Sequence, residues 1–188
     1  MNAPHTDLRV VKTQRAIANA LIGLLDEKPF EKIQVQEIIE KALINRTTFY
    51  RYYSGKSDLA GKLIKQVKAD YQALLKKRFE SDNLVRFMQT VGNRLLENRR
   101  LVLALWKINT PRHHLYADMH AMLKQAFTAH ARKVKSADKD RDYQAAVFAT
   151  IALESHRYAF ERGEVLKIPQ VFDEWAEMVE ILKAVQAG

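Results

Sequence analysis

Residues Val35 to Tyr53 read VQEIIEKALINRTTFYRYY, and the expected fold class follows from this stretch. Its first part spaces apolar residues three and four positions apart, which predicts one buried face of a short helix. These residues are Val35, Ile38, Ile39 and Ala42. Asn45 can cap a second helix, because its side-chain oxygen can accept a hydrogen bond from the helix N-terminus. Two short helices joined by a tight turn form a helix-turn-helix, whose second helix enters the major groove of DNA.

The second helix of this motif carries arginine, threonine and tyrosine side chains, which suit a surface that reads DNA. Arginine offers forked donors to phosphate or guanine, threonine offers a hydroxyl beside a methyl that can meet thymine, and tyrosine can donate to phosphate oxygens. Phe49 interrupts the polar run and is expected to anchor the helix in the core. We expect Asn45, Arg46, Thr47, Thr48, Tyr50 and Tyr53 at the DNA surface, with Arg46 and Tyr53 toward phosphates. An ordinary helical hairpin with tyrosine and arginine on its surface is the alternative reading.

Residues 12–64 resemble the N-terminal domain of the TetR family of transcriptional regulators. The shared features are a helical spacing of apolar residues, a Thr-Phe-Tyr run, and a lysine six residues after that run. They are carried by Ile17, Leu24, Leu25, Phe30, Val35, Ile38, Thr48, Phe49, Tyr50, Tyr52, Tyr53, Lys56 and Leu59. Beyond about residue 64 the resemblance depends on the order of the helices alone.

Three positions depart from the family's usual pattern. Gln34 stands where threonine usually caps the second helix and touches phosphate, and glutamine caps poorly. Leu43 stands in the turn where glycine is usual, and Ile39 replaces a common alanine. The resemblance implies phosphate contacts at Gln34 and at Lys56. These departures do not change the expected fold.

Apolar spacing predicts the other helices, at residues 9–25, 56–80, 84–97, 101–108, 113–133, 143–162 and 169–185. Residues 1–8 are expected to be a flexible polar start, and residues 136–142 a charged loop. Thr13, near the start of the first helix, could donate to a phosphate, since helix N-termini suit anions; a plain solvent-facing threonine is the equal alternative. No strand pattern is present, so we predict an all-α protein. A three-helix DNA-binding domain occupies residues 1–55, and a larger helical domain occupies residues 56–188, with residues 56–80 as a connector helix.

Composition limits the function classes. The 188 residues are 47% hydrophobic and include no cysteine, which excludes disulfides, thiolate nucleophiles and cysteine-based zinc sites. No apolar run reaches the roughly 18 residues of a membrane span, and the first residues lack an apolar signal-peptide core, so we expect a cytoplasmic protein. The net charge of +9 favours a polyanionic partner. Most of this charge lies in residues 61–141, whereas residues 142–188 are acidic.

Catalytic and metal chemistry are not favoured. His114 and Asp118 lie one helical turn apart, but the His-x-x-x-His pairing of a strong zinc site is missing. His156 is interpreted as a satisfied core histidine, with a cavity-facing histidine as the alternative. The chain has no glycine-rich phosphate loop, nucleophile elbow or paired-carboxylate motif. We therefore expect neither an enzyme nor a cofactor.

The family resemblance implies a ligand pocket among the helices after the connector and a homodimer formed by the last two helices. The expected pocket residues, which could equally be a filled core, are Phe87, Val91, Arg94, Leu105, Trp106, His114, Met119 and Met122. This pocket is mostly apolar, so an uncharged or weakly polar effector would fit, with Arg94 or His114 holding a polar group. The expected dimer residues are Phe148, Ala152, Ala159, Phe160, Val171, Trp175, Met178 and Leu182.

The function predicted from these features is sequence-specific transcriptional regulation, most simply repression released by a small-molecule effector. The expected partners are an operator in double-stranded DNA and a second copy of the chain. Two alternatives stay open at this point. One is a regulator of the same class that answers to a protein partner, and the other is a helical ligand-binding or scaffold protein that does not touch DNA.

Overall fold

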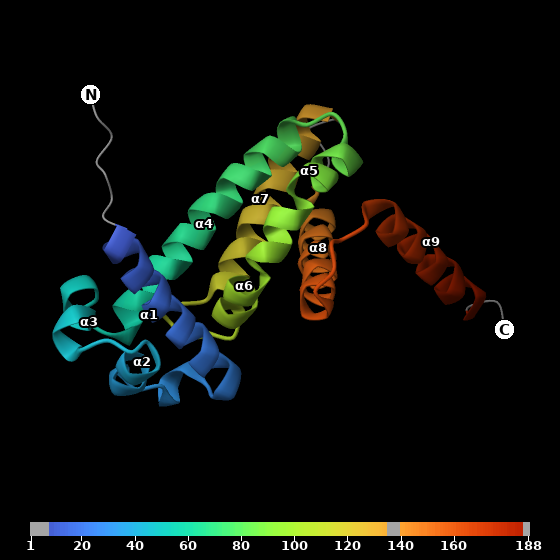
Figure 1. Ribbon diagram of the computed structural model, residues 1–188. Coiled ribbons are helices and arrows are strands. Elements are labelled where there is room, and N and C mark those ends of the chain that lie inside the picture. The colour runs from blue at the N-terminus through green and yellow to red at the C-terminus, as the bar shows by residue number, and fades with distance from the viewer. Residues whose placement is uncertain (1–7, 135–139, 186–188) are drawn as a thin grey trace, which may run out of the picture. The chain divides into compact units, whose positions relative to one another are not determined.

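The computed structural model describes residues 8–134 and 140–185, which form α-helices and one short 3₁₀ turn, η1, with no strand among them. Figure 1 labels the α-helices in chain order. Their bounds are α1 Leu8–Glu27, η1 Phe30–Lys32, α2 Val35–Lys41, α3 Arg46–Tyr52, α4 Lys56–Glu80, α5 Leu84–Glu97, α6 Arg99–Trp106, α7 Leu115–Val134, α8 Asp142–Arg162 and α9 Ile168–Val185. The all-α prediction is confirmed. None of the helices described has the length and apolarity that a bilayer crossing requires.

The predicted helix bounds agree best with the structure where the sequence contains a clear capping or helix-breaking residue. Helices α4 and α5 have the predicted bounds. Helix α8 ends at the predicted Arg162, and Gly163, with a left-handed φ of 70°, forms its C-terminal cap. The start of α7 differs: the helix begins at Leu115 and not at residue 113, because Thr110 and His113 close a turn through reciprocal backbone bonds of 2.8 and 3.2 Å. The expected polar start and charged loop largely lie outside the described residues, although Leu8 and Asp142 belong to helices.

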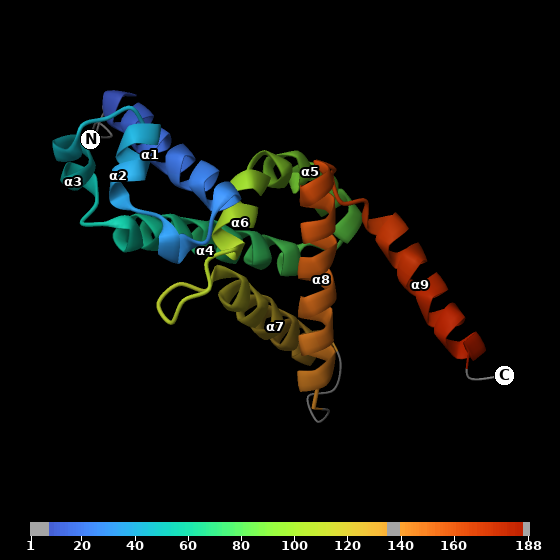
Figure 2. The same cartoon turned by 90° about the horizontal axis from the view of Figure 1, so that it is seen from below.

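The described chain divides into two compact units, and the first contains residues 8–70 and 100–118. Within it, α1, α2 and α3 surround the start of α4, as both views show (Figures 1 and 2). Its core is formed by fully buried side chains of these helices, of α6, of the first residue of α7 and of the segments that join them. The largest are Ile17, Leu21, Ile33, Ile38, Phe49, Leu59, Leu105, Ile108 and Leu115.

This first unit is larger than the DNA-binding domain expected over residues 1–55. It also holds the first half of α4, most of α6 and the segment that follows α6. Lys107 on this segment donates to the Leu25 carbonyl at 3.3 Å and to the Asp26 carboxylate at 2.7 Å. Residues distant in sequence therefore belong to the same body as the helix-turn-helix.

The second unit contains residues 71–99 and the described residues from 119 onward. Phe127 on α7 stacks on Phe148 of α8, with ring centroids 4.7 Å apart. Helix α5 approaches the segment after α8 so closely that a Cβ on Gly92 would lie 2.5 Å from Val165. Helix α9 diverges from α8 in both views (Figures 1 and 2).

Candidate nucleic-acid interface

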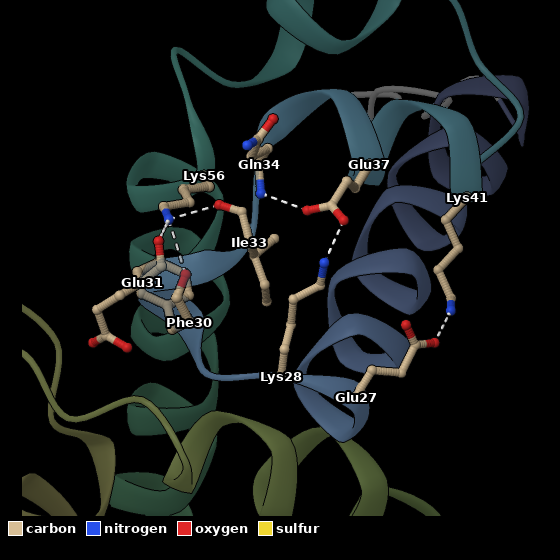
Figure 3. A network of polar contacts seen from close by, with 9 residues as sticks. All are labelled: Glu27, Lys28, Phe30, Glu31, Ile33, Gln34, Glu37, Lys41 and Lys56. Carbon is tan, nitrogen blue, oxygen red and sulfur yellow. Dashed lines mark hydrogen bonds and ion pairs between the residues drawn. The ribbon is translucent and has the colours of Figure 1, made fainter.

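Helix α2 is fixed to its surroundings by polar contacts at its first turn. The Glu37 carboxylate accepts a hydrogen bond from the Gln34 backbone N–H at 2.9 Å and also pairs with Lys28 (Figure 3). The bond from Lys28, reinforced by the Gln34 N–H, lowers the pKa of Glu37 below its ordinary value. A second pair, Lys41 with Glu27, joins the end of α2 to the end of α1. On the inner side Ile38 and Ile39 are buried.

The Glu37 contacts predict a dependence of stability on pH. Because the pKa of Glu37 is lowered in the folded state, its stabilisation is present above its unfolded pKa of about 4.3 and is lost as pH falls below it. We therefore expect Glu37→Gln to have a lower melting temperature than the wild type at pH 7, and the difference to shrink below pH 4. Thermal unfolding followed by circular dichroism from pH 3 to 7 measures this. A difference that is constant with pH would contradict it.

The turn between α2 and α3 contains a strained residue. Leu43 has a φ of 54°, in the left-handed region that glycine adopts without a steric cost, and its side chain is 92% exposed. The backbone conformation is held by hydrogen bonds from the Leu43 N–H to Glu40 and from the Ile44 N–H to Ile39. The turn thus keeps the geometry expected of glycine although leucine occupies the position.

Replacing Leu43 with glycine should stabilise the protein by roughly 1 kcal/mol, since the left-handed conformation costs a non-glycine residue about 1–2 kcal/mol. The greater backbone freedom of glycine in the unfolded chain offsets part of the gain. Urea denaturation of Leu43→Gly and of Leu43→Ala measures this gain in the free energy of unfolding. Alanine is the control, because it keeps the Cβ and should gain little stability. Equal stability of the two variants would show that the turn is not strained.

Helix α3 is anchored on one side and capped at its start. Asn45 accepts a hydrogen bond from the Thr48 backbone N–H at 2.7 Å, which confirms the predicted N-cap. Phe49 is fully buried, and its ring lies 5.4 Å from that of Tyr50 and 5.7 Å from that of Tyr53. The buried phenylalanine fixes which side of this two-turn helix faces outward.

The outward side of α3 carries a set of polar side chains that we name the reading face. Successive residues of a helix are turned by about 100°. Four exposed residues therefore cover the part of the helix surface that runs from about 60° to about 200° around from Phe49. They are Arg46, Thr47, Tyr50 and Arg51. The Arg46 guanidinium lies over the Tyr50 ring at 5.3 Å, which holds both side chains at the surface. This arrangement offers hydroxyl and guanidinium donors in one patch, as contact with DNA requires.

Thr48 is among the residues expected at the DNA surface, whereas Arg51 is not. Arg51 is exposed on the same side of α3 as Thr47, whereas Thr48 is half-buried on the flank. The exposure of Arg51 could have been predicted from the sequence, because Arg51 lies nearly opposite the predicted anchor Phe49 on a helical projection. A DNA contact of Thr48 stays a prediction.

Tyr53 and Lys56 depart from their expected positions at the DNA surface. The Tyr53 side chain is only 7% exposed, and its desolvation raises the pKa of its hydroxyl. The Lys56 ammonium donates to the carbonyls of Phe30, Glu31 and Ile33 at 2.8, 2.8 and 2.7 Å (Figure 3). These three bonds occupy all three of its N–H donors. Both residues thus have a structural role within the domain.

Asp58 fixes the segment that connects α3 to α4. Its carboxylate accepts hydrogen bonds from the Ser54 backbone N–H and from Lys62, both at 3.0 Å, and the Ser54 bond is the main cause of a lowered pKa. Lys62 also donates to the Tyr52 carbonyl at 2.8 Å. The last turn of α3 is therefore tied to the first turns of α4.

The expected phosphate contact at Thr13 is not supported by its geometry. Its hydroxyl donates to the Arg9 carbonyl at 2.8 Å, one turn earlier in α1, so it does not present its proton to an anion. Helix α1 begins at Leu8, which places Thr13 beyond the first turn. Gln34 is exposed and precedes α2, as expected, and a phosphate contact there stays a prediction.

The residues expected to line a ligand pocket do not all belong to one unit. Three of them, Leu105, Trp106 and His114, lie in the first unit, and His114 pairs with Asp118 at 3.0 Å. The second unit holds Phe87, Val91, Arg94, Met119 and Met122. Arg94 is exposed, and Met119 is buried. The pocket stays a prediction.

A different hollow is present in the second unit, between α5 and the segment that joins α8 to α9. It has a volume of about 360 Å³ and is lined by Val85, Met88, Gln89 and residues 165–170. It includes none of the eight expected pocket residues. In the described part of the chain, no group of three or more histidine, aspartate and glutamate side chains is placed to hold a metal ion.

The expected dimer residues separate into two groups. On α8, Ala159 and Phe160 are buried within the single chain, whereas Phe148 and Ala152 are partly exposed, and Phe148 stacks on Phe127. On α9, Met178 is 49% exposed and Leu182 is 61% exposed, and Val171 and Trp175 are partly exposed. The pattern of apolar residues did not distinguish the core of one chain from a surface shared by two.

Comparison with known proteins agrees with this geometry. Residues 17–63 match the family model of bacterial regulatory proteins of the tetR family. The uncharacterized HTH-type transcriptional regulator YxbF of Bacillus subtilis (strain 168) is 36% identical over 61 residues, which are 32% of this chain and 16% of that protein. The matched region is thus about a sixth of that relative's length.

Two solved structures extend the similarity over most of the chain. A TetR transcriptional regulator from Streptococcus agalactiae 2603V is 22% identical, with a TM-score of 0.60 over 95% of this chain and 99% of that chain. The complex of SmeT with triclosan is 18% identical, with a TM-score of 0.56 over 78% of this chain and 79% of that chain. At these identities the similarity shows a shared fold.

Proposed function

We infer from its membership of the TetR family of bacterial regulatory proteins that this chain is a sequence-specific DNA-binding transcriptional regulator. The observation that carries the inference is the reading face. Arg46, Thr47, Tyr50 and Arg51 are exposed together on a capped helix that is anchored in the core by Phe49. A helix of this kind, second in a helix-turn-helix, presents its side chains to base edges in the major groove.

The side chains of the reading face divide into two chemical roles. Arg46 and Arg51 can neutralise phosphates, or donate two hydrogen bonds to guanine. Thr47 offers a hydroxyl and a methyl, which can distinguish thymine from other bases. The backbone contacts position the helix, and the base contacts give the sequence preference.

Binding as a two-fold dimer is the second part of the proposal. At about 100° per residue, six apolar side chains of α9 fall within a face of roughly 120°, wide enough for a packed helix. They are Val171, Phe172, Trp175, Met178, Val179 and Leu182. Four of the six, Phe172, Met178, Val179 and Leu182, are 45–61% exposed in the single chain. A second copy that covers this face would present two reading helices to successive turns of DNA, about 34–36 Å apart.

We further propose that the regulator is a repressor released by an uncharged or weakly polar small molecule. Support comes from the structural similarity to SmeT, which was solved in complex with triclosan. Helix α4 runs without interruption from Lys56 to Glu80, so it belongs to both units and can transmit a change from one to the other. An effector shifts operator binding only by its differential affinity for two arrangements, typically 5–150-fold. Control by a protein partner is the alternative.

Replacing Thr47 with alanine tests the reading face. We expect the base preference to relax at one operator position by roughly 1–3 kcal/mol, because the hydroxyl and methyl that discriminate the base are lost. The measurement is competition binding with duplexes that carry each of the four bases at every position of a selected operator. Thr90→Ala is the matched control, since Thr90 is an exposed threonine on α5. An unchanged preference at all positions in Thr47→Ala would contradict the proposed docking.

A further inference from the structure

The segment between α6 and α7, residues 107–114, which we name the corner, is attached to the DNA-binding unit at two places. At the first, the Lys107 ammonium donates to the Asp26 carboxylate at 2.7 Å and to the Leu25 carbonyl at 3.3 Å. Asp26 also pairs with Arg100 of α6 at 3.7 Å. A cation therefore sits at the carbonyl end of α1, where the helix dipole favours positive charge.

The second attachment is the side chain of His113. It is only 7% exposed, and its Nε2 lies 2.8 Å from the Ser57 hydroxyl in the first turn of α4. The ring meets the Phe30 ring edge-on, with centroids 6.4 Å apart. The reciprocal backbone bonds between Thr110 and His113 fix the backbone that carries the imidazole.

Gly61 provides the space that the imidazole occupies. A Cβ built on Gly61 would lie 3.1 Å from the His113 Cε1 atom, closer than ordinary van der Waals contact. Glycine in the middle of a helix is unfavourable by comparison with alanine. The packing of the His113 imidazole against Gly61 therefore explains why a glycine stands at this position, although glycine weakens α4.

The atoms that His113 touches also position the helix-turn-helix. Ser57 adjoins Lys56, whose ammonium donates to the carbonyls of Phe30 and Glu31 in η1 and lies 5.0 Å from the centroid of the Phe30 ring. The same turn of α4 holds Asp58, which is bonded to Ser54 directly after α3 and its cap. A movement of the corner would thus act on the turn that sets the position of the reading face relative to α4.

We propose that the corner is a control point for DNA affinity and that His113 is a positioning residue for the reading face. The inference rests on the proposed function, and it adds an input to the DNA-binding unit besides α4 itself. A change that displaces residues 107–114 would lower operator affinity by releasing Ser57 and Phe30, without removing any group that contacts DNA.

The test is a double-mutant cycle between His113 and Gly61, with operator affinity as the readout. A duplex selected from a random pool by the wild type is the probe, and each variant is measured at a temperature where circular dichroism shows it folded. We expect His113→Ala to bind about tenfold more weakly, within the usual range of coupling between sites, with an unchanged salt slope because no phosphate contact is lost. His113→Gln, whose amide can still form a hydrogen bond with the Ser57 hydroxyl, should recover most of the affinity.

Gly61→Ala supplies the matched comparison. In the wild-type background its methyl group should displace the imidazole and weaken binding, whereas in the His113→Ala background it should be neutral or favourable. A lower melting temperature with wild-type operator affinity in His113→Ala would overturn the proposal, because it would show a role in stability alone. An equal loss of operator affinity from Gly61→Ala in both backgrounds would also overturn the proposal. A wild type that enriches no duplex would instead overturn the proposed function.

Discussion

Val179→Glu should dissociate the protein into monomers whose operator affinity is roughly 10²–10⁴-fold lower, the range expected when two linked binding modules become one. Val179 lies on the apolar face of α9 and is 45% exposed in the single chain, so glutamate there should leave the monomer folded. In the proposed dimer the same carboxylate would be buried without a partner, which is strongly unfavourable. Sedimentation equilibrium at micromolar concentration measures the association, and fluorescence anisotropy measures the DNA affinity.

Helix α9 offers a matched control for this substitution. Ile181 is also apolar and is 58% exposed, but it lies about 120° away from the centre of the apolar face. Ile181→Glu introduces the same charge into the same helix and should stay dimeric. Dissociation by both variants, or by neither, would contradict the assignment of the apolar face as the dimer surface.

Lys56→Ala should destabilise the protein by about 2–3 kcal/mol. The ammonium makes three bonds to the carbonyls of Phe30, Glu31 and Ile33. Hydrogen bonds to a charged group each contribute about 1.5–3 kcal/mol when buried, and the partly solvated site reduces the total. The bonds also offset the unfavourable position of a cation in the first turn of α4. Urea denaturation monitored by circular dichroism provides the free energy of unfolding.

Lys62→Ala is the control for the loss of one positive charge. Lys62 is more exposed, and it donates to the Tyr52 carbonyl and to Asp58. Exposed pairs of this kind contribute about 1 kcal/mol or less. If Lys56→Ala lowered the salt slope of DNA binding by about one with little loss of stability, Lys56 would be a phosphate contact, as the family resemblance implied, and its structural role would be minor.

The helix-turn-helix was predictable because its signals are local. The apolar spacing around Ile38, the cap at Asn45 and the anchor at Phe49 all lie within a few residues of the structure that they specify. Arg51 could have been found from the same helical projection. The outward side of α3 is thus a property of a short stretch of sequence.

The contacts made by Lys56 and His113 were not predictable from local patterns. Lys56 binds carbonyls 23–26 residues earlier, in a 3₁₀ turn that has no side-chain signature of its own. His113 was expected at the first residue of a helix, where its sequence neighbours give no sign of burial, yet it packs against Ser57 and into the space at Gly61. Similarly, the pattern at Phe148 and Phe160 shows that these residues pack, but not whether the partner is the same chain or a second copy.

Selection of duplex DNA from a random pool by the wild-type protein, followed by measurement of affinity and stoichiometry, tests whether the protein reads a sequence as a dimer. We expect an inverted repeat whose half-sites are centred about 10–10.5 base pairs apart, bound by two chains. Affinity for this duplex should exceed that for a scrambled one by at least about 10³-fold at physiological salt. No enriched sequence, or equal affinity for selected and scrambled duplexes at every salt concentration, would contradict the account.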